Sequence, residues 1–194
     1  MSSSSNKSKS ILKDLRNLII WVIFALIIRW QVIEPRWIPS GSMLPTLNIQ
    51  DKILVEKISP KIGSSTNLSN LKNEIIVFKA PQPLIDSGYE QNIALIKRVI
   101  GVPGDKIEIK EGQLFLNDVE QHKYISDSNI NYSVEPIIVP DQYLWVMGDN
   151  RNNSMDSHVW GFLPYKKIIG KAIYRYWPFN KIGPIRFPAL NNLN

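Results

Sequence analysis

The sequence contains no cysteine and only two histidines, His122 and His158. The absence of cysteine excludes disulfide frameworks, iron–sulfur clusters, cysteine-ligated metals and thiol nucleophiles. Two histidines argue against a multi-histidine metal site within one chain, and we expect neither a metal nor another cofactor. Thirteen prolines and ten glycines argue against a helical bundle and favour short strands joined by tight turns.

Length and charge set further bounds on the protein. A chain of 194 residues suits one domain with an appendage rather than several domains. Basic residues outnumber acidic residues by 23 to 17, which gives a formal net charge of +6. This excess of positive charge is moderate, and we expect no nucleic acid as a partner.

The amino-terminal part of the chain has a strong local bias. Residues 18–28 carry no polar side chain, and four basic residues lie between positions 7 and 16. Residues 1–14 are predicted to form a disordered, basic and Ser-rich cytoplasmic tail. Residues 15–33 are predicted to form a transmembrane anchor, with Arg29 near its end reaching toward the lipid headgroups. Because basic leaders tend to remain in the cytoplasm, we expect a single pass with residues 34–194 outside.

Two other interpretations of this segment fit less well. A cleaved signal peptide should end in small residues resembling Ala-x-Ala, and residues 29–35 offer no such site. A buried core helix is the second interpretation, but an apolar surface on all sides behind a basic leader is unusual for a globular core. A retained membrane anchor is therefore the preferred interpretation.

Short strand-like segments follow Pro35 and predict a mainly β domain. We expect strands at residues 52–58, 74–79, 93–100, 106–110, 113–116, 143–147 and 168–177. The two strands around Glu111 and Gly112 resemble a hairpin. Residues 59–73 are rich in Ser and Asn and are predicted to form an exposed loop.

The first segment with candidate chemistry is IPSGSMLPTL at residues 38–47. Two serines flank a glycine, and prolines on both sides stiffen the segment. Such a segment can hold a hydroxyl in a fixed, exposed orientation, as a nucleophile requires. Taken alone, the same composition also fits an ordinary surface turn.

The second segment is IKRVIGVPGD at residues 96–105. On a strand, alternation sends Lys97 and Arg98 to opposite faces, and Lys97 then shares its face with Leu95 and Val99. Apolar neighbours disfavour the ammonium ion and lower the pKa of a lysine, which a lysine general base requires. A solvated lysine on an edge strand is the alternative.

The third segment is GDNRNNSMDS at residues 148–157, whose small polar residues suit a hydrogen-bonded loop. A calcium-binding loop is excluded, because Arg151 and Ser154 stand where a ligand and a glycine belong. His158 and Asp156 are the obvious pair for a histidine-based serine protease, but their proximity in sequence does not make a relay. The Gly-x-Ser-x-Gly elbow is absent as well.

Together these segments resemble the bacterial type I signal peptidases, which are membrane-anchored serine proteases. The resemblance runs from residue 34 to residue 177 and includes the motifs at 40–47, 97–105 and 148–157, in that order. It implies a mainly β fold, with a coiled, barrel-like core and a smaller attached sheet. It also implies cleavage of signal peptides from exported preproteins after small residues at −1 and −3.

The resemblance implies a role for each matched residue. Ser42 would be the nucleophile and Lys97 the general base, with Ser40 and the Ser42 amide forming the oxyanion hole. Ser154 would hydrogen-bond and orient the Lys97 amine. The remaining matched residues would pair charges, hold the loop or line the substrate pockets. Arg98 would pair with Asp149, Asp156 would hold the loop, and the S1 and S3 pockets would be lined by Ile38, Met43, Leu47, Ile53, Val77, Leu95 and Ile96.

The resemblance also implies partners and a location. These are the signal peptides, the lipid bilayer and, beyond them, the protein-export machinery, at a bacterial plasma membrane or a thylakoid-type internal membrane. Four residues depart from the family pattern. His158 stands where many relatives carry Arg, Gln50 and Asn73 stand at positions that are often Gly, and Arg36 stands at a commonly apolar pocket edge.

Two alternatives stay open at this point. The chain could be a catalytically silent, membrane-anchored β domain that acts as a binding or assembly factor. It could also be a Ser/Lys autoprotease of the repressor type, although that group needs a DNA-binding domain where this chain has its apolar segment. The presence of both Ser42 and Lys97 favours an active enzyme.

Overall fold

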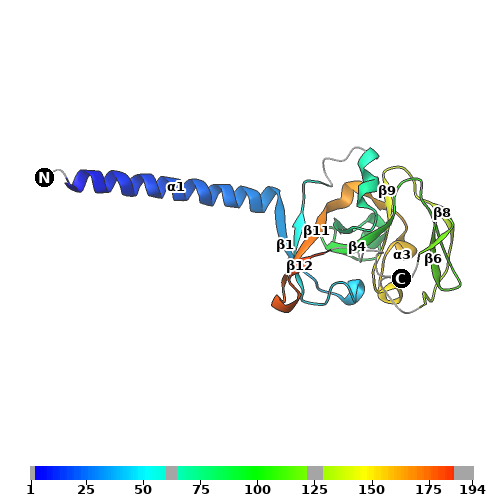
Figure 1. The fold of residues 1–194 in the computed structure, drawn as a ribbon. Coiled ribbons are helices and arrows are strands. Elements are labelled where there is room, and N and C mark those ends of the chain that lie inside the picture. The colour runs from blue at the N-terminus through cyan, green and yellow to red at the C-terminus, as the bar shows by residue number, and fades with distance from the viewer. Residues whose placement is uncertain (1–2, 60–64, 122–128, 186–194) are drawn as a thin grey trace.

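The structure, a computed structural model, describes residues 3–59, 65–121 and 129–185. Its first element is the helix α1, Ser3–Gln31, which projects from a β-rich domain (Figure 1). The helix begins at Ser3, so residues 3–14 are helical where the sequence predicts disorder. A helix that has formed extends without a new nucleation cost. It also ends before Ile33, which starts a strand, because Pro35 favours extended backbone just before it.

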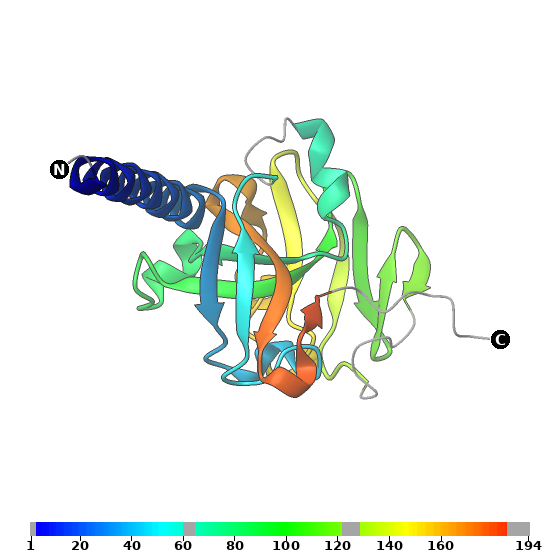
Figure 2. The same cartoon turned by 60° about the vertical axis from the view of Figure 1, so that its left-hand side comes forward.

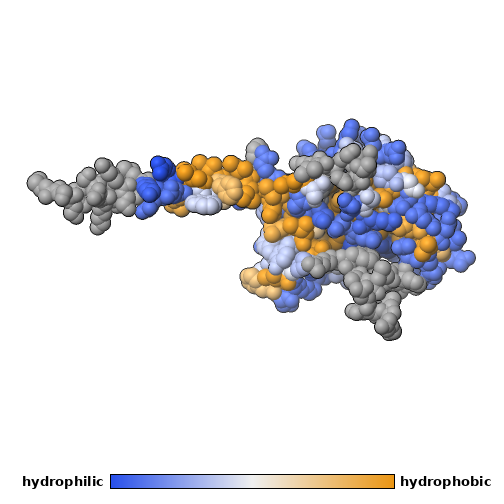
Figure 3. Space-filling model, turned by 45° about the horizontal axis from the view of Figure 1, so that its top comes forward, coloured by the Kyte–Doolittle hydropathy of each residue, from blue (hydrophilic) through white to orange (hydrophobic). Residues whose placement is uncertain are grey.

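The described apolar side chains of α1 are largely exposed, among them Leu18, Trp21 and Leu26. The surface of the helix is apolar where it approaches the domain and hydrophilic farther from it (Figure 3). Among the residues that the structure describes, no helix combines the length and the hydropathy that a membrane crossing requires.

In the part of the domain that the structure describes there are two antiparallel sheets, which makes the fold mainly β as predicted. The larger sheet has the order β1-β2-β11-β3-β4-β9-β10, with β12 paired to β11 (Figure 2). Its strands are β1 Ile33–Trp37, β2 Lys52–Glu56, β3 Ile75–Lys79, β4 Ala94–Gly101, β9 Tyr143–Met147, β10 Leu163–Pro164, β11 Ile168–Trp177 and β12 Gly183–Pro184. Its closure into a barrel-like coil stays a prediction.

The smaller sheet lies on the side of the domain away from α1 and has the order β7-β6-β5-β8 (Figure 1). Its strands are β5 Lys106–Lys110, β6 Gln113–Leu116, β7 Val119–Gln121 and β8 Val134–Ile138. The expected hairpin is present as the pair β5–β6. Buried Ile107 and Leu114 pack with Trp145 and Met147 of β9, so one apolar cluster joins the two sheets.

Short helices connect the strands. They are η1 Gly41–Met43, η2 Ser65–Leu71, α2 Gln82–Asp86, η3 Arg151–Asn153, α3 Ser157–Trp160, η4 Tyr165–Lys167 and η5 Phe179–Lys181. The prediction of an exposed loop at 59–73 is wrong for residues 65–71, which form η2. Leu68 and Leu71 of this helix are buried in the core. Residues 60–64 of that prediction lie outside the described residues.

Two apolar clusters occupy opposite faces of the larger sheet. Along β3, Ile76 and Phe78 belong to one cluster, whereas Ile75 and Val77 belong to the other. This division follows from strand alternation, which sends successive side chains to opposite faces. Consecutive side chains of the neighbouring strand β4 therefore lie on opposite faces of the sheet, next to different clusters. Lys97 and Arg98 are two such residues.

Candidate active site

Ser42 lies in the short helix η1, in a turn that buried neighbours hold in place. Met43 and Leu47 are fully buried in one apolar cluster, and the Leu47 amide donates to the Met43 carbonyl at 2.9 Å. Ser40 precedes the helix with an extended backbone and makes no capping hydrogen bond with its side chain. The turn therefore fixes the Ser42 backbone and leaves the Ser40 hydroxyl available beside it.

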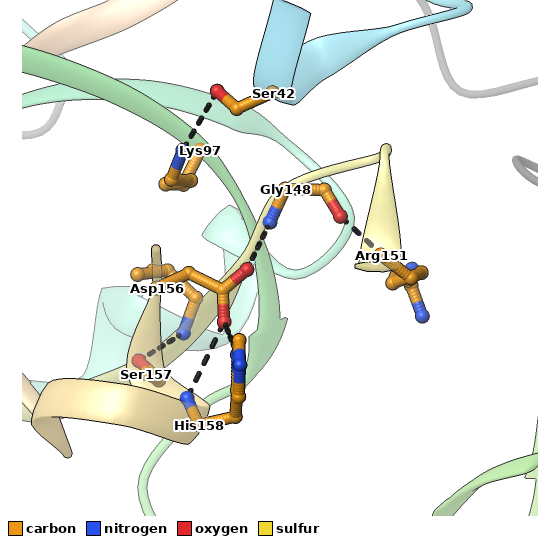
Figure 4. Close-up of polar contacts among 8 residues, drawn as sticks. Ser42, Lys97, Gly148, Arg151, Asp156, Ser157 and His158 are labelled. Atoms are coloured by element: carbon orange, nitrogen blue, oxygen red, sulfur yellow. Dashed lines mark hydrogen bonds and ion pairs between the residues drawn. The ribbon is translucent and has the colours of Figure 1, made fainter. Parts of the chain in front are cut away.

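Lys97 projects from the middle of β4 and reaches this serine. Its Nζ lies 2.7 Å from Ser42 Oγ, across 55 residues of sequence (Figure 4). The lysine is only 5% exposed. Burial lowers the pKa of Lys97 from 10.5 to about 8, while the negative charges of Asp156 and Asp149 act in the opposite direction.

The expected hydroxyl pair of the first segment is also present. Ser40 Oγ lies 3.4 Å from Ser42 Oγ. A second hydroxyl thus stands next to the one that Lys97 contacts. This arrangement can supply a hydrogen-bond donor to an oxygen atom bound beside Ser42.

Arg98 faces away from Lys97 and forms the expected buried ion pair. Its Nε and Nη2 donate to the two carboxylate oxygens of Asp149 at 2.8 and 2.7 Å, and its Nη1 donates to the Asn73 carbonyl at 2.6 Å. The side chains of Arg98 and Asp149 are 1% and 0% exposed. The pair ties the loop after β9 to the strand that carries Lys97.

Asp156 contacts the same loop from its other end, as the family resemblance implies. It accepts from the Gly148 amide at 2.8 Å and pairs with His158 Nδ1 at 2.8 Å (Figure 4). The His158 ring also stacks on Tyr132, with 3.8 Å between the ring centroids. The basic side chain that contacts the Ser42 hydroxyl is that of Lys97. His158 contacts Asp156 instead.

Ser154 differs from its expected contact. Its Oγ is buried and has no hydrogen-bond partner among the described residues, so the expected bond to the Lys97 amine is not made. The hydroxyl packs instead over Gly148, where an added Cβ would lie 2.2 Å from it. The sequence identifies the segment correctly but cannot fix the rotamer of one serine within it.

Six of the seven expected pocket residues gather in one cluster beside the serine turn. Leu95 is the exception, because strand alternation places it on the opposite face of β4, against the cluster that contains Val99. The six that lie together are Ile38, Met43, Leu47, Ile53, Val77 and Ile96. Leu95 therefore does not share a pocket wall with them.

The departures from the family pattern have local explanations. Gln50 and Asn73 both adopt positive φ, at 70° and 68°, which is the left-handed region that glycine occupies without cost. Arg36 pairs with Glu34 two residues earlier on β1, and Glu34 also contacts Lys57 at 3.3 Å. At this position on β1, the ion pair of Arg36 with Glu34 thus replaces the apolar side chain that is common in the family.

Two residues of the site have no counterpart among the sequence-based assignments. Arg175 on β11 donates to the Thr46 carbonyl at 2.9 Å and contacts Asp51 at 3.0 Å, which braces the end of the serine turn. Asn150 donates to two backbone carbonyls of that turn. Both act on backbone atoms from distant parts of the chain, and a lone arginine or asparagine gives no sequence signal for such contacts.

Comparison with known proteins places this site in a family. A signal peptidase I from Leptolyngbya laminosa is 38% identical over 186 residues, which cover 96% of this chain and 89% of the relative. "Probable signal peptidase I-1" from Synechocystis is 42% identical over 174 residues, covering 87% and 83%. "Probable thylakoidal processing peptidase 2, chloroplastic" from Arabidopsis thaliana is 41% identical over 169 residues, covering 84% of this chain and 43% of the longer relative.

The family described as "Signal peptidase, peptidase S26" matches residues 11–177, a range that includes all three segments of the site. The sequence resemblance, the match over most of the chain and the contact between serine and lysine agree with one another. This chain belongs to the signal peptidase family, peptidase family S26.

Proposed function

We propose that this chain is a serine endopeptidase that removes amino-terminal signal peptides from exported preproteins, with Ser42 as nucleophile and Lys97 as general base. The observation that carries the proposal is the 2.7 Å contact between Lys97 Nζ and Ser42 Oγ in a buried setting. A general base must lie within hydrogen-bond reach of the proton that it removes. The names of the relatives support the substrate class.

The protonation state of Lys97 supports this role. With a pKa of about 8, about a quarter of the amines are neutral at pH 7.5, against about one in 1,000 for a lysine at 10.5. A neutral amine can take the Ser42 proton as the hydroxyl attacks the scissile carbonyl. The resulting ammonium can then donate that proton to the leaving amine, and the lysine can next activate the water that hydrolyses the acyl-enzyme.

Two hydrogen-bond donors beside the nucleophile can stabilise the oxyanion that forms on the scissile carbonyl. The Ser42 backbone N–H is one, and the Ser40 hydroxyl, 3.4 Å from Ser42 Oγ, is the other. Donors that are already in place when charge develops on the carbonyl oxygen lower the barrier, and losing one typically costs about 2.7–4 kcal/mol. Ser40 therefore contributes to the chemical step rather than to substrate affinity.

The proposed specificity for small residues at −1 and −3 is supported by the packing next to the serine. Ile38, Met43, Ile53 and Val77 are buried against one another beside the serine turn, which agrees with the shallow apolar pockets that the family resemblance implies. A bulky side chain could enter such pockets only by displacing the core. Preproteins with small residues at these two positions should be cleaved in preference to those with large residues.

We also propose that α1 anchors the chain in a lipid bilayer, with its basic end in the cytoplasm and the β domain outside. The exposed apolar side chains along α1 support the anchor, and Lys13 and Arg16 ahead of them support the orientation. The apolar run is short for a bilayer, so Arg29 must extend toward the headgroups. Protease added to spheroplasts should digest the region after residue 35. A fully protected carboxy-terminal domain would overturn this topology.

Cleavage of a preprotein in detergent tests the central proposal. Sequencing of the new amino terminus should place the cut after a small residue, and Ser42→Ala and Lys97→Ala should each abolish turnover. The double variant should be no worse than either single variant, because the two residues act as a unit. Lys79→Ala, an exposed lysine on the adjacent strand β3, is the matched control and should retain activity. Substantial cleavage by Lys97→Ala would point to His158 as the base.

A further inference from the structure

Asn150, which has no role in the proposed catalytic mechanism, binds the backbone of the Ser42 turn through two hydrogen bonds. The Asn150 backbone N–H donates to the Ser42 carbonyl at 3.0 Å. Its side-chain Nδ2 donates to the Gly41 carbonyl at 3.2 Å. One residue thus binds the two consecutive carbonyls that flank the Ser42 Cα.

These two bonds constrain the atoms that matter for catalysis. A peptide unit is planar, so the Gly41 carbonyl and the Ser42 N–H are rigidly coupled at opposite sides of one plane. A donor that fixes the Gly41 oxygen therefore fixes the direction of the Ser42 N–H. The bond to the Ser42 carbonyl fixes the next plane, and together they set the backbone dihedral angles at the nucleophile.

The position of Asn150 is itself well defined. The preceding residue, Asp149, is locked to Arg98 on β4 by two short hydrogen bonds. Asn150 immediately precedes η3, and its carbonyl accepts from the Asn153 amide at 3.0 Å. The strand that carries the lysine and the turn that carries the serine are consequently connected through residues 149 and 150.

The close approach of this loop depends on the absence of a side chain at Gly148. A Cβ at this position would lie 2.5 Å from the Ser42 carbonyl oxygen, closer than real Cβ contacts. The backbone of the loop therefore touches the serine turn directly. This contact brings both donors of Asn150 within reach of their carbonyls.

We propose that Asn150 is a positioning residue for the oxyanion hole, which aligns the Ser42 N–H by holding the Gly41–Ser42 peptide plane. The inference rests on the proposed function and adds to it the group that orients the backbone donor. Because the hydrogen bond withdraws electron density through the peptide unit, it also makes the Ser42 N–H a better donor. The role belongs to the side-chain amide, since the backbone N–H of any residue except proline could make the other bond.

Steady-state kinetics of Asn150→Ala on a preprotein should show kcat reduced about 10- to 100-fold with KM little changed, because misplacement of a transition-state donor affects the chemical step. The rising limb of the pH profile should stay in place, since no charge near Lys97 changes. Asn152→Ala is the matched control. Its Nδ2 donates to the Asn129 carbonyl at 2.8 Å, away from the serine turn, and the variant should keep near wild-type kcat.

A peptide aldehyde that ends in a small residue separates alignment of the oxyanion donor from general loosening. Ser42 Oγ adds to its carbonyl carbon, the carbonyl π electrons move to the oxygen, and the serine proton passes to Lys97, so the adduct carries the oxyanion. Asn150→Ala should weaken aldehyde inhibition by the factor that kcat loses, while binding of the corresponding peptide amide, a stable ground-state analogue, stays constant. Asn150→Leu, which has a similar size, cannot donate and adds no charge, should show the same loss of aldehyde affinity if Asn150→Ala does not fold.

Two results would overturn the inference while the proposed function stands. One is wild-type kcat in Asn150→Ala. The other is a displaced pH profile with unchanged aldehyde affinity, which would mean that Asn150 acts through Lys97. A wild-type protein that cleaves no preprotein would instead overturn the proposed function, and this inference with it.

Discussion

Replacing Lys97 with methionine should stabilise the protein while abolishing its activity. In the unfolded chain the amine titrates near 10.5, and in the folded chain near about 8. Each tenfold change in a protonation equilibrium is worth about 1.4 kcal/mol, so folding at pH 7 carries a penalty of about 3 kcal/mol for burying this amine. Methionine has a similar length and carries no charge to desolvate. The lost hydrogen bond to Ser42 offsets part of the gain, at about 1 kcal/mol.

The sign of the pH dependence identifies the source of this gain. Between pH 8 and 10.5 the unfolded chain holds a proton on Lys97 that the folded chain has lost, so the wild type gains stability as the pH rises through this window. Below pH 8 the penalty is fully present. The advantage of Lys97→Met should therefore be about 1–3 kcal/mol at pH 7 and should disappear toward pH 10.5.

Urea denaturation of both proteins in the same detergent, at pH 7 and pH 10, measures this difference, because effects of all other groups cancel between them. Lys79→Met on β3 is the control and should show a small, pH-independent change, since its side chain is exposed. An equal effect of Lys97→Met at both pH values would refute the buried-amine reasoning. So would a variant that is less stable than the wild type at pH 7.

Three further predictions concern the surroundings of the dyad. The acylation rate should rise with pH through an apparent pKa of about 8. Asp156→Asn should move this rise to lower pH, because Asp156 raises the pKa of Lys97. Stopped-flow measurement of acyl-enzyme formation from pH 6 to 10 checks both. Asp149→Asn should cost about 3–5 kcal/mol in urea denaturation, since it leaves Arg98 buried opposite a neutral amide. Gly148→Ala should abolish cleavage in the preprotein assay, because its Cβ would overlap the serine turn.

The strands that the sequence predicts are those with a strong local pattern, and those it misses lie at edges. The sequence predicts four strands whose bounds the structure reproduces, at residues 106–110, 113–116, 143–147 and 168–177. The missed strand β1 contains Pro35 and the missed strand β8 contains Pro136, and each is the last strand of its sheet. Proline cannot donate to a strand ladder, so it is tolerated at an edge and lowers the local strand signal. The missed strands β7, β10 and β12 are too short to show a period.

The candidate site shows the same division. Ser42 and Lys97 stand out because each lies in a segment of unusual composition, and Lys97 has apolar neighbours at alternating positions. Contacts to backbone atoms do not stand out, because any residue offers the same carbonyl. The hydrogen bonds of Asn150 and Arg175 to the serine turn depend on how segments distant in the sequence pack against each other. No local sequence pattern indicates this packing.

The placement of an amine that can lose its proton and a guanidinium on consecutive residues of β4 has a consequence for folding. A slip of one position between β3 and β4 would exchange the faces of Lys97 and Arg98. The guanidinium, which cannot lose its proton, would then face the serine turn without a carboxylate, and Asp149 would lose its partner. The ion pair with Asp149 thus penalises a slip of one residue between these strands. The alignment that brings a lysine to Ser42 is specified during folding by its charged neighbour.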